Sequence, residues 1–366
     1  MAAAVFVCFF VFTLIIICLA TPAVSWKKAG ADDTAAAATI FPAIFTFGDS
    51  ALDMGNNNNR FTMFKANYLP YGQDFTNHKP TGRFCNGKLV SDITAETLGF
   101  QTYPPPYLSP EASGRNLLIG AGFASAAAGY DEQASISNRA ITLSQQLGNY
   151  KEYQSKVAMV VGDEEAGAIV ANGLHILSCG TGDYLRNYYI NPGVRRRFTP
   201  YEYSSFLVAS FSKFIKDLHG LGARKIGVTS LPPLGCFPAA LTQFGYQQEK
   251  GCVRTINNEV LVFNRKLNST AATLQKQLSG LKLVVFDVFK PLYDAIMSPS
   301  THGFDEVRKG CCSTGAVETV SVLCNPKFHE TCSNATKYMF WDSIHLSEAA
   351  NQMLADTMIV QGYALV

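Results

Sequence analysis

Five short apolar runs recur along the chain, separated by small and polar residues. Their Val, Ile, Leu and Phe content is typical of strands that are buried on both faces of a sheet. They cover residues 43–47, 117–123, 174–179, 226–231 and 283–288. Longer stretches with apolar residues at helical spacing alternate with them, at 89–98, 143–153, 201–218 and 260–278. This alternation predicts an α/β fold, with a parallel sheet between two helical layers and ligands bound beyond the carboxyl ends of the strands.

Composition narrows the class of protein. Of the 366 residues, 48% are hydrophobic and 16% charged, which supplies a large core and excludes a disordered or fibrous chain. Lys and Arg (30) nearly balance Asp and Glu (28), and the one basic cluster, 195–197, has no interleaved aromatic residues. Nucleic acid is therefore not an expected partner. No repeat and no Pro/Gly-rich linker divides the chain, so we predict a single domain over residues 41–366.

The N-terminus predicts the compartment. An almost unbroken apolar run over residues 5–19 breaks at Thr21-Pro22 and is followed by small residues and then Lys27-Lys28. This is a signal-peptide pattern, and a run of about 15 residues is shorter than the roughly 20 that a membrane-spanning helix needs. We expect a signal peptide at 1–25, a short linker at 26–40 and a secreted, extracellular protein without a later membrane span. The absence of Lys or Arg before the apolar run leaves an uncleaved anchor open.

Eight cysteines remain once Cys8 and Cys18 leave with the signal peptide. An oxidising compartment makes disulfides the default for them. Cys236 and Cys252 bracket a loop, whereas the pairing within the cluster Cys311, Cys312, Cys324 and Cys332 is open. A zinc site is the alternative, but there is no C-x-x-C motif and only His329 lies nearby, so no metal is expected. Asn268 and Asn334 begin N-glycosylation tripeptides, which fits the same compartment.

Three nucleotide and hydrolase motifs fail on inspection. The segment 82–88 has P-loop glycine spacing, but Leu89 stands where Ser or Thr would bind Mg²⁺. Gly120 and Gly122 follow an apolar run, yet Ser125 occupies the third glycine position of a dinucleotide fingerprint. The chain contains no G-x-S-x-G, which argues against the common α/β-hydrolase elbow.

One constellation that carries chemistry remains. Ser50, in Gly48-Asp49-Ser50, lies immediately past the first predicted strand, and Asp342 and His345 lie three residues apart near the other end of the chain. In one loop, Asp342 can accept a hydrogen bond from one ring nitrogen of His345 and leave the other nitrogen to take the Ser50 proton. The alternative is that Ser50 is a turn former or helix cap and that Asp342 and His345 are a surface or capping pair.

Together these segments resemble the plant GDSL-type esterase/lipases of the SGNH hydrolase superfamily. The resemblance spans about residues 41–361 and lies in 45–58, 82–88, 120–129, 182–192, 231–236 and Phe340-Trp341-Asp342-Ser343-Ile344-His345. It implies a three-layer α/β/α flavodoxin-like fold with a central parallel sheet. It also implies a secreted serine esterase or lipase that hydrolyses acyl esters, with Ser50, His345 and Asp342 as nucleophile, base and orienter and with no cofactor. The expected partner is a small-molecule or lipid ester.

Two departures from the family pattern fall on the oxyanion hole, which the family forms at Ser50, Ala127 and Gly182. The family usually has Gly at Ala127, whose backbone N–H can still serve if its dihedral angles suit a residue with a Cβ. It usually has Gly-x-Asn-Asp where this chain reads Gly180-Thr181-Gly182-Asp183. Since glycine supplies no side-chain donor, we expect a weakened enzyme, unless a backbone N–H or a water substitutes. Asp53 and Asp183 are expected to hydrogen-bond the loops that carry Ser50 and this third block.

Two other functions use the same residues. A non-catalytic secreted binding protein on a hydrolase fold would bind without turnover, and an acyltransferase would pass the acyl group to an acceptor other than water. The ester itself does not follow from the sequence, because the loops 61–79 and 184–199 are expected to shape the pocket. His175 and Cys179, on the third apolar run, are interpreted as buried core residues.

Overall fold

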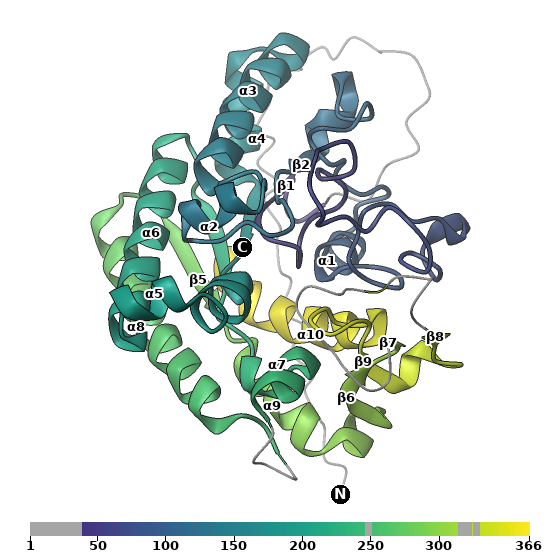
Figure 1. The fold of residues 1–366 in the computed structure, drawn as a ribbon. Helices are drawn as coiled ribbons and strands as arrows, with labels where there is room; N and C mark the ends of the chain where they lie inside the picture. Colours follow the sequence, from purple (N-terminus) through teal and green to yellow (C-terminus); the bar gives the residue numbers. More distant parts are fainter. Residues whose placement is uncertain (1–38, 246–250, 314–323, 325–329) are drawn as a thin grey trace, which may run out of the picture. The chain divides into compact units, whose positions relative to one another are not determined.

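Five parallel strands form the central sheet of the computed structural model (Figure 1), which describes residues 39–245, 251–313, 324 and 330–366. Their order is β2-β1-β3-β4-β5, with Ile44 of β1 opposite Gly120 of β2 and Leu174 of β3. This is the flavodoxin-like order, so the predicted fold class is confirmed. The strands are β1 (Ile44–Gly48), β2 (Gly120–Gly122), β3 (Leu174–Ser178), β4 (Lys225–Thr229) and β5 (Lys282–Phe286). The predicted signal peptide and residues 26–38 of the predicted linker lie outside the described residues.

The second strand is shorter than the prediction of 117–123. A 3-10 turn covers Gly114–Ile119, and only three residues pair with β1. Gly120 has φ +101°, and a Cβ there would lie 2.0 Å from the carbonyl oxygen of Ile44. The close approach of two backbones thus needs glycine at this point, and it limits the strand to its Gly-Ala-Gly segment.

Ten α-helices, seven short 3-10 or π-helical turns and four short strands complete the described part of the chain. Three of the four predicted helices run past at least one end of their apolar stretches, whereas the one at 89–98 is shorter, Val90–Thr97. Capping boxes mark two of the starts: Thr142 and Gln145 form one before α3, and Thr199 and Glu202 form one before α6. The helices are α1 (Val90–Thr97), α2 (Glu132–Ser137), α3 (Leu143–Val161), α4 (Asp163–Asn172), α5 (Pro192–Arg197), α6 (Pro200–Gly220), α7 (Pro238–Phe244), α8 (Arg254–Gln277), α9 (Phe289–Met297) and α10 (Glu348–Gln361). The short strands are β6 (Glu306–Gly310) with β9 (Tyr338–Phe340), and β7 (Cys312–Ser313) with β8 (Glu330–Thr331).

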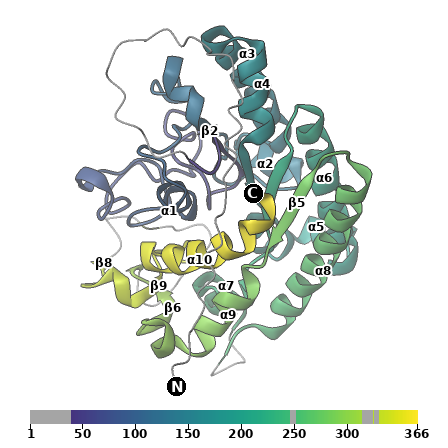
Figure 2. The same cartoon turned by 180° about the vertical axis from the view of Figure 1, so that it is seen from behind.

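The helices form two layers, one on each face of the sheet (Figures 1 and 2). Helices α3, α6 and α8 pack together on one face, where the ring of Phe47 meets Tyr150 of α3 and Phe214 of α6. Helices α1 and α10 pack against each other on the opposite face, where Met358 of α10 shares a hollow with Ile176 of β3. A parallel sheet covered on both faces explains why its strands read as continuous apolar runs.

The order of the strands determines where in the sheet a ligand site is expected. From β1 the chain crosses to β2 at one edge, and from β3 it continues toward β4 and β5, so the direction of winding changes between β1 and β3. In such sheets the crevice beyond the carboxyl ends at this switch point is where ligands bind. Residues 49–50 follow β1 and residues 179–182 follow β3, so two of the predicted blocks meet at that crevice.

Disulfides settle the cysteine pairing that the sequence left open. Cys236 pairs with Cys252, Cys311 with Cys332, and Cys312 with Cys324. The expected disulfides are therefore confirmed for six of the eight cysteines, and the four sulfurs of the zinc alternative are bonded to one another. Cys85 and Cys179 are free and buried. In the part of the chain that the structure describes, no helix combines the length and the apolar character needed to cross a bilayer.

Candidate active site

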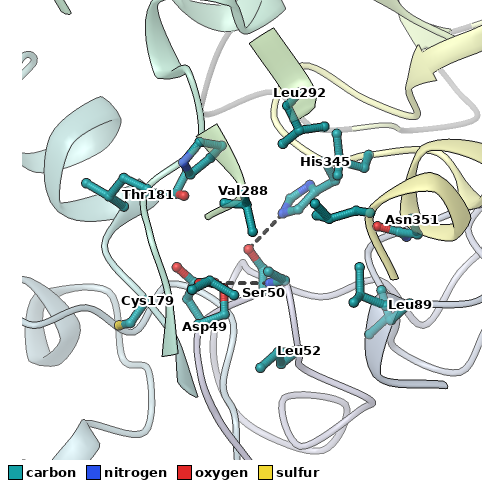
Figure 3. A pocket seen from close by; sticks show the side chains of 18 of the residues that line it. Asp49, Ser50, Leu52, Leu89, Cys179, Thr181, Val288, Leu292, His345 and Asn351 are labelled. Carbon is teal, nitrogen blue, oxygen red and sulfur yellow. Dashed lines mark hydrogen bonds between the residues drawn. The ribbon is translucent and has the colours of Figure 1, made fainter. Parts of the chain in front are cut away.

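Ser50 and His345 lie side by side although 295 positions separate them. The Ser50 hydroxyl and Nε2 of His345 are 2.7 Å apart, as the dashed line in Figure 3 shows. Ser50 follows β1 directly, and His345 lies in the loop before α10. This is the hydrogen bond that a hydroxyl nucleophile needs with its base.

Asp342 fixes the other side of the imidazole. Its Oδ2 and Oδ1 lie 2.7 and 2.9 Å from Nδ1 of His345, and Oδ1 also accepts from the N–H groups of Ile344 and His345. Burial raises the pKa of Asp342, but His345, the Tyr71 hydroxyl and the Ile344 N–H outweigh it and hold that pKa below its ordinary value. The carboxylate is thus charged at neutral pH and orients His345 so that Nε2 faces Ser50.

Tyr71 contributes a contact that sequence reasoning missed. Its hydroxyl donates to Oδ2 of Asp342 at 2.6 Å, and the whole side chain is buried. Tyr71 packs in a small cluster with Trp341 and the cystines of the Cys311–Cys332 region. The N–H groups of Cys311 and Cys312 donate to the carbonyls of Phe340 and Trp341. These two disulfide-bonded cysteines therefore support the loop that carries Asp342.

A tight turn that requires glycine precedes Ser50. Gly48 has φ +119°, and a Cβ there would lie 1.8 Å from the carbonyl oxygen of Ser178, so only glycine fits. The Gly48 N–H donates to Gln146 Oε1, whose amide donates back to the Gly48 carbonyl. Asp49 then accepts from the Ala51 N–H at 3.0 Å. Burial raises the pKa of Asp49 to about 6, against the lowering effects of Ala51 N–H, Arg186 and His345.

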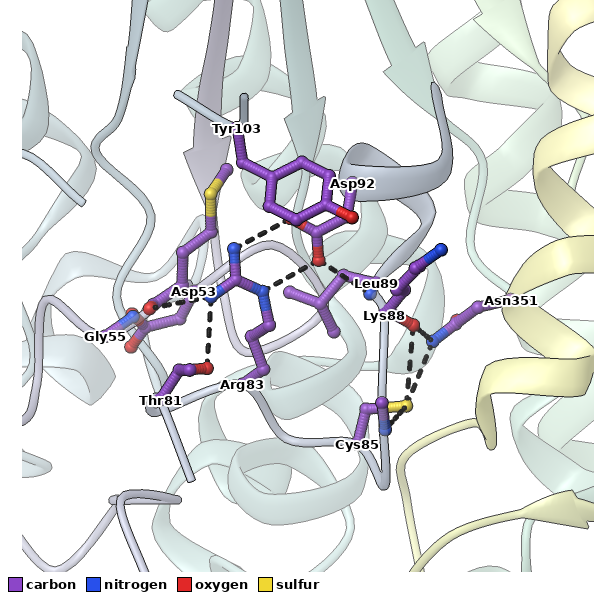
Figure 4. Close-up of polar contacts among 12 residues, drawn as sticks. Asp53, Gly55, Thr81, Arg83, Cys85, Lys88, Leu89, Asp92, Tyr103 and Asn351 are labelled. Atoms are coloured by element: carbon purple, nitrogen blue, oxygen red, sulfur yellow. Dashed lines mark hydrogen bonds and ion pairs between the residues drawn. The ribbon is translucent and has the colours of Figure 1, made fainter. Parts of the chain in front are cut away.

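The segment 82–88, whose glycines resemble a P-loop, braces the histidine loop instead. The Phe84 ring lies 4.8 Å from the His345 ring. Behind it, Arg83 and Asp92 form a buried two-pronged ion pair with both contacts at 2.7 Å (Figure 4). Asn351 of α10 donates to the Lys88 carbonyl at 2.9 Å, which ties this segment to the helix that follows His345.

The positions predicted for the oxyanion hole share one small pocket. Ser50, Ala127, Gly182, Arg186 and His345 all line it. Ala127 adopts φ +69°, a left-handed conformation that costs a residue with a Cβ about 1–2 kcal/mol relative to glycine. The chain thus tolerates at Ala127 a backbone conformation that favours glycine.

Asp53 and Asp183 tie the blocks together. Asp53 accepts from the N–H groups of Gly55 and Asn56 in its own loop, and its second oxygen accepts from the Ala126 N–H. Asp183 is expected from the sequence to hydrogen-bond the loop that carries it, but it accepts instead from the N–H groups of Tyr130 and Asp131. Burial raises the pKa of Asp53 to about 6 and that of Asp183 to about 8, against the hydrogen bonds that each carboxyl accepts.

A larger, mainly apolar pocket opens on the other side of Ser50 and His345 (Figure 3). Loops 61–79 and 184–199, which are expected from the sequence to shape the pocket, contribute nothing to the lining of this larger one. Phe64, Leu185 and Arg186 of those loops line the small pocket beside Ser50 instead. Strand ends and helices α1, α9 and α10 form the larger one. Its apolar side chains include Leu52, Leu89, Leu231, Val288, Leu292 and Leu354.

The remaining predicted residues lie as follows. His175 is fully buried, hydrogen-bonds the Tyr150 hydroxyl at 2.7 Å, and has its pKa lowered to about 3 by burial, as befits a core histidine. Burial raises the pKa of the Cys179 thiol well above its ordinary value, so it is not a reactive thiolate. Asn268 and Asn334 are both exposed, on α8 and at the cap of a 3-10 turn.

Comparison with known proteins matches the sequence to a family. A family model described as GDSL-like Lipase/Acylhydrolase matches residues 44–358. The chain belongs to the GDSL esterase/lipase family. It is 59% identical to the GDSL esterase/lipase APG of Arabidopsis thaliana, over 90% of this chain and 93% of that protein. It is 54% identical to GDSL esterase/lipase At5g22810 of the same plant, over 89% of this chain and 91% of that protein. As a family member it is an acylhydrolase.

Proposed function

We propose that the chain hydrolyses carboxylic acyl esters through a Ser50-His345-Asp342 triad. The observation that carries the proposal is the 2.7 Å contact between Ser50 Oγ and His345 Nε2 at the mouth of a pocket, with the imidazole anchored by Asp342. Ser50 is only partly buried, so its hydroxyl is accessible to a ligand. A pair whose only role was structural would need no opening beside the hydroxyl.

The reaction follows from the hydrogen-bond order. Ser50 Oγ bonds to the ester carbonyl carbon while its proton passes to Nε2 of His345, and the carbonyl oxygen takes the negative charge. The N–H groups of Ser50 and Ala127 stabilise that oxyanion, and no side-chain donor comes from Gly182. His345 then protonates the leaving alcohol as the ester C–O bond breaks. Water, deprotonated by His345, releases the acid from the acyl-enzyme.

The lining of the larger pocket indicates an apolar acyl group. Aliphatic side chains surround the space next to Ser50, and among the described residues no Lys or Arg contributes to that lining. An alkyl chain gains about 0.8 kcal/mol for each buried methylene, so extended acyl chains are favoured over acetyl. The substrate class proposed is therefore an ester of an apolar carboxylic acid.

The first experiment compares the purified protein with Ser50→Ala on p-nitrophenyl esters. Loss of at least about 10⁴-fold in kcat is expected, since removing a triad nucleophile leaves only the oxyanion hole and binding. Equal rates in the two proteins would remove Ser50 from the mechanism. Fluorophosphonate labelling of the wild type alone gives a second readout.

A matched pair of substitutions tests the acyl pocket. Leu292→Phe narrows it and should shift the preferred acyl chain to a shorter length, whereas Leu98→Phe, in the hollow beside α10 that lies away from Ser50, should leave the preference unchanged. The readout is kcat/KM across a series from acetate to decanoate. An unchanged profile in Leu292→Phe would place the acyl chain elsewhere.

The departure at Gly182 favours one alternative, a non-catalytic binding protein on the same fold. It predicts ligand binding without turnover and no covalent fluorophosphonate label. Acyl transfer uses the same triad and predicts transesterification in excess of hydrolysis when an alcohol is added. Both alternatives are tested with the p-nitrophenyl esters, by measuring hydrolysis with and without an added alcohol, together with fluorophosphonate labelling.

Secretion, with cleavage after Ser25 and a single domain over 41–366, is also proposed. The three disulfides support it, because they persist in an oxidising compartment. N-terminal sequencing of protein recovered from the medium of expressing cells should begin at Trp26. Recovery of the chain in the membrane fraction, with residues 1–25 retained, would indicate the uncleaved anchor.

A further inference from the structure

Gly182 is not required by the backbone. Its φ and ψ are −68° and −32°, ordinary helical values that any residue adopts. What distinguishes the position is the space beside it: a Cβ on Gly182 would lie 2.9 Å from Nη2, 3.5 Å from Nε and 3.6 Å from Cζ of Arg186. The guanidinium of Arg186 thus occupies the room into which a side chain at position 182 would extend.

The placement of Arg186 follows from its local structure. It lies on a π-helical turn, Asp183–Tyr188, four residues after Gly182, a spacing that brings two side chains onto one face of a helix. The Phe64 ring covers the guanidinium plane, with Cζ 4.3 Å from the ring centroid. The Phe64 carbonyl accepts from the Asn57 amide, which holds this ring's segment in place.

Arg186 has spare hydrogen-bonding capacity at the reaction centre. Its Nε is buried and has no hydrogen-bond partner among the residues that the structure describes. The side chain lines the small pocket together with Ser50, Ala127 and His345. Burial lowers the pKa of Arg186 to about 10, against the effects of Asp49 and Asp183, so the guanidinium is charged at neutral pH. A charged guanidinium that lines the pocket of the nucleophile and holds an N–H without a partner in the described part of the chain points to an anionic ligand atom.

We propose that Arg186 is the oxyanion-hole donor that replaces the side chain missing at Gly182. This rests on the proposed function. When Ser50 Oγ bonds to the carbonyl carbon and its proton passes to His345, the electron pair of the opening C=O bond resides on the oxygen, and an Arg186 N–H donates to that oxygen beside the N–H groups of Ser50 and Ala127. The oxyanion hole is therefore rearranged, and it uses a charged donor where the family pattern has a neutral amide.

The test is a double-mutant cycle in which Gly182→Asn should change kcat in opposite directions in the wild-type and Arg186→Met backgrounds. In the wild type, Gly182→Asn forces its side chain onto the guanidinium and should lower kcat. In the Arg186→Met background the space is free of donors, and the same Gly182→Asn change should raise kcat. Arg186→Met alone should lower kcat about 10²- to 10³-fold with a small change in KM, the usual cost of one oxyanion donor. Arg197→Met, which also removes an arginine next to an aromatic ring but on the exposed surface, should keep the wild-type rate.

Two further readouts separate catalysis from structure. Affinity for an alkyl boronic acid, which forms a tetrahedral anionic adduct with the serine, should fall in parallel with kcat. Millimolar guanidinium should restore part of the activity of Arg186→Ala. If Arg186→Met does not fold, Gly182→Ala serves instead, because its Cβ displaces the guanidinium with the arginine retained.

The inference fails if Gly182→Asn changes kcat in the same direction in both backgrounds, or if Arg186→Met keeps kcat within threefold of the wild type. Failure of the proposed function is distinguishable, since Ser50→Ala would then hydrolyse esters as fast as the wild type. An inactive Ser50→Ala together with a fully active Arg186→Met overturns the role of Arg186 alone.

Discussion

The Tyr71 hydroxyl donates a 2.6 Å hydrogen bond to the same Asp342 oxygen that accepts the hydrogen bond from Nδ1–H of His345. Asp342 therefore has a second partner from a segment 271 residues away. A buried carboxylate held by several donors keeps its charge and a single orientation. Tyr71 is a positioning residue, since it acts on the reacting atoms only through Asp342 and His345.

Tyr71→Phe should reduce kcat about 10-fold, because a hydrogen bond to a charged group contributes roughly 1.5–3 kcal/mol. It should also change the pH profile. The bond lowers the pKa of Asp342, so its loss raises that pKa, and activity should disappear at a higher pH as the pH is lowered. Tyr68→Phe, whose hydroxyl bonds the Cys324 carbonyl and not Asp342, is the control. If the acid limb of the pH–activity profile is the same in Tyr71→Phe as in the wild type, Tyr71 serves in packing only.

Gly48→Ala should prevent folding or abolish the serine turn. Its φ of +119° is unfavourable for a residue with a Cβ, and the added carbon would overlap the Ser178 carbonyl oxygen. Gly167→Ala, within helix α4 with nothing within 4 Å of the added carbon, should instead stabilise the protein by about 0.5–1 kcal/mol. Thermal unfolding of the two variants measures the contrast, and equal melting temperatures would contradict it.

Breaking the buried Arg83–Asp92 pair should be costly. Arg83→Met leaves the Asp92 carboxylate buried without its partner, and an uncompensated buried charge costs about 3–5 kcal/mol. The exposed pair Lys213–Asp217 on α6 offers a comparison, and Lys213→Met should cost no more than about 0.5 kcal/mol. Denaturant unfolding gives both values. Similar losses in the two variants would show that the Arg83–Asp92 pair is not isolated from solvent.

Stability should decline as the pH rises from about 6 to 8. The folded pKa of Asp183 is raised to about 8 by burial, so between its unfolded and folded pKa values the folded state binds the proton that the unfolded state has released. Folding then loses up to about 1.4 kcal/mol per pH unit. In Asp183→Asn this contribution is absent, and the slope of melting temperature against pH should be shallower. Identical slopes would assign the decline to another group.

Local pattern determined much of this protein in advance. Four of the five sheet strands lie in apolar runs bounded by small or polar residues, and the start of α10 follows from Ser347, so the α/β fold could be predicted from short segments of sequence. Ser50, Asp342 and His345 could be singled out as well. A hydroxyl after a strand and an Asp-x-x-His loop are patterns that a few neighbouring residues specify.

Tertiary structure alone decided which distant side chains meet. Nothing near Tyr71 in the sequence indicates a hydroxyl aimed at Asp342, and the lining of the larger pocket comes from strand ends and helices that no local pattern brings together. Arg186 carried a faint signal, its spacing of four from Gly182, but its position against Phe64 depends on packing across 122 residues. Periodicity and turn chemistry are properties of adjacent residues, whereas contacts between remote segments are set by how the layers close on the sheet.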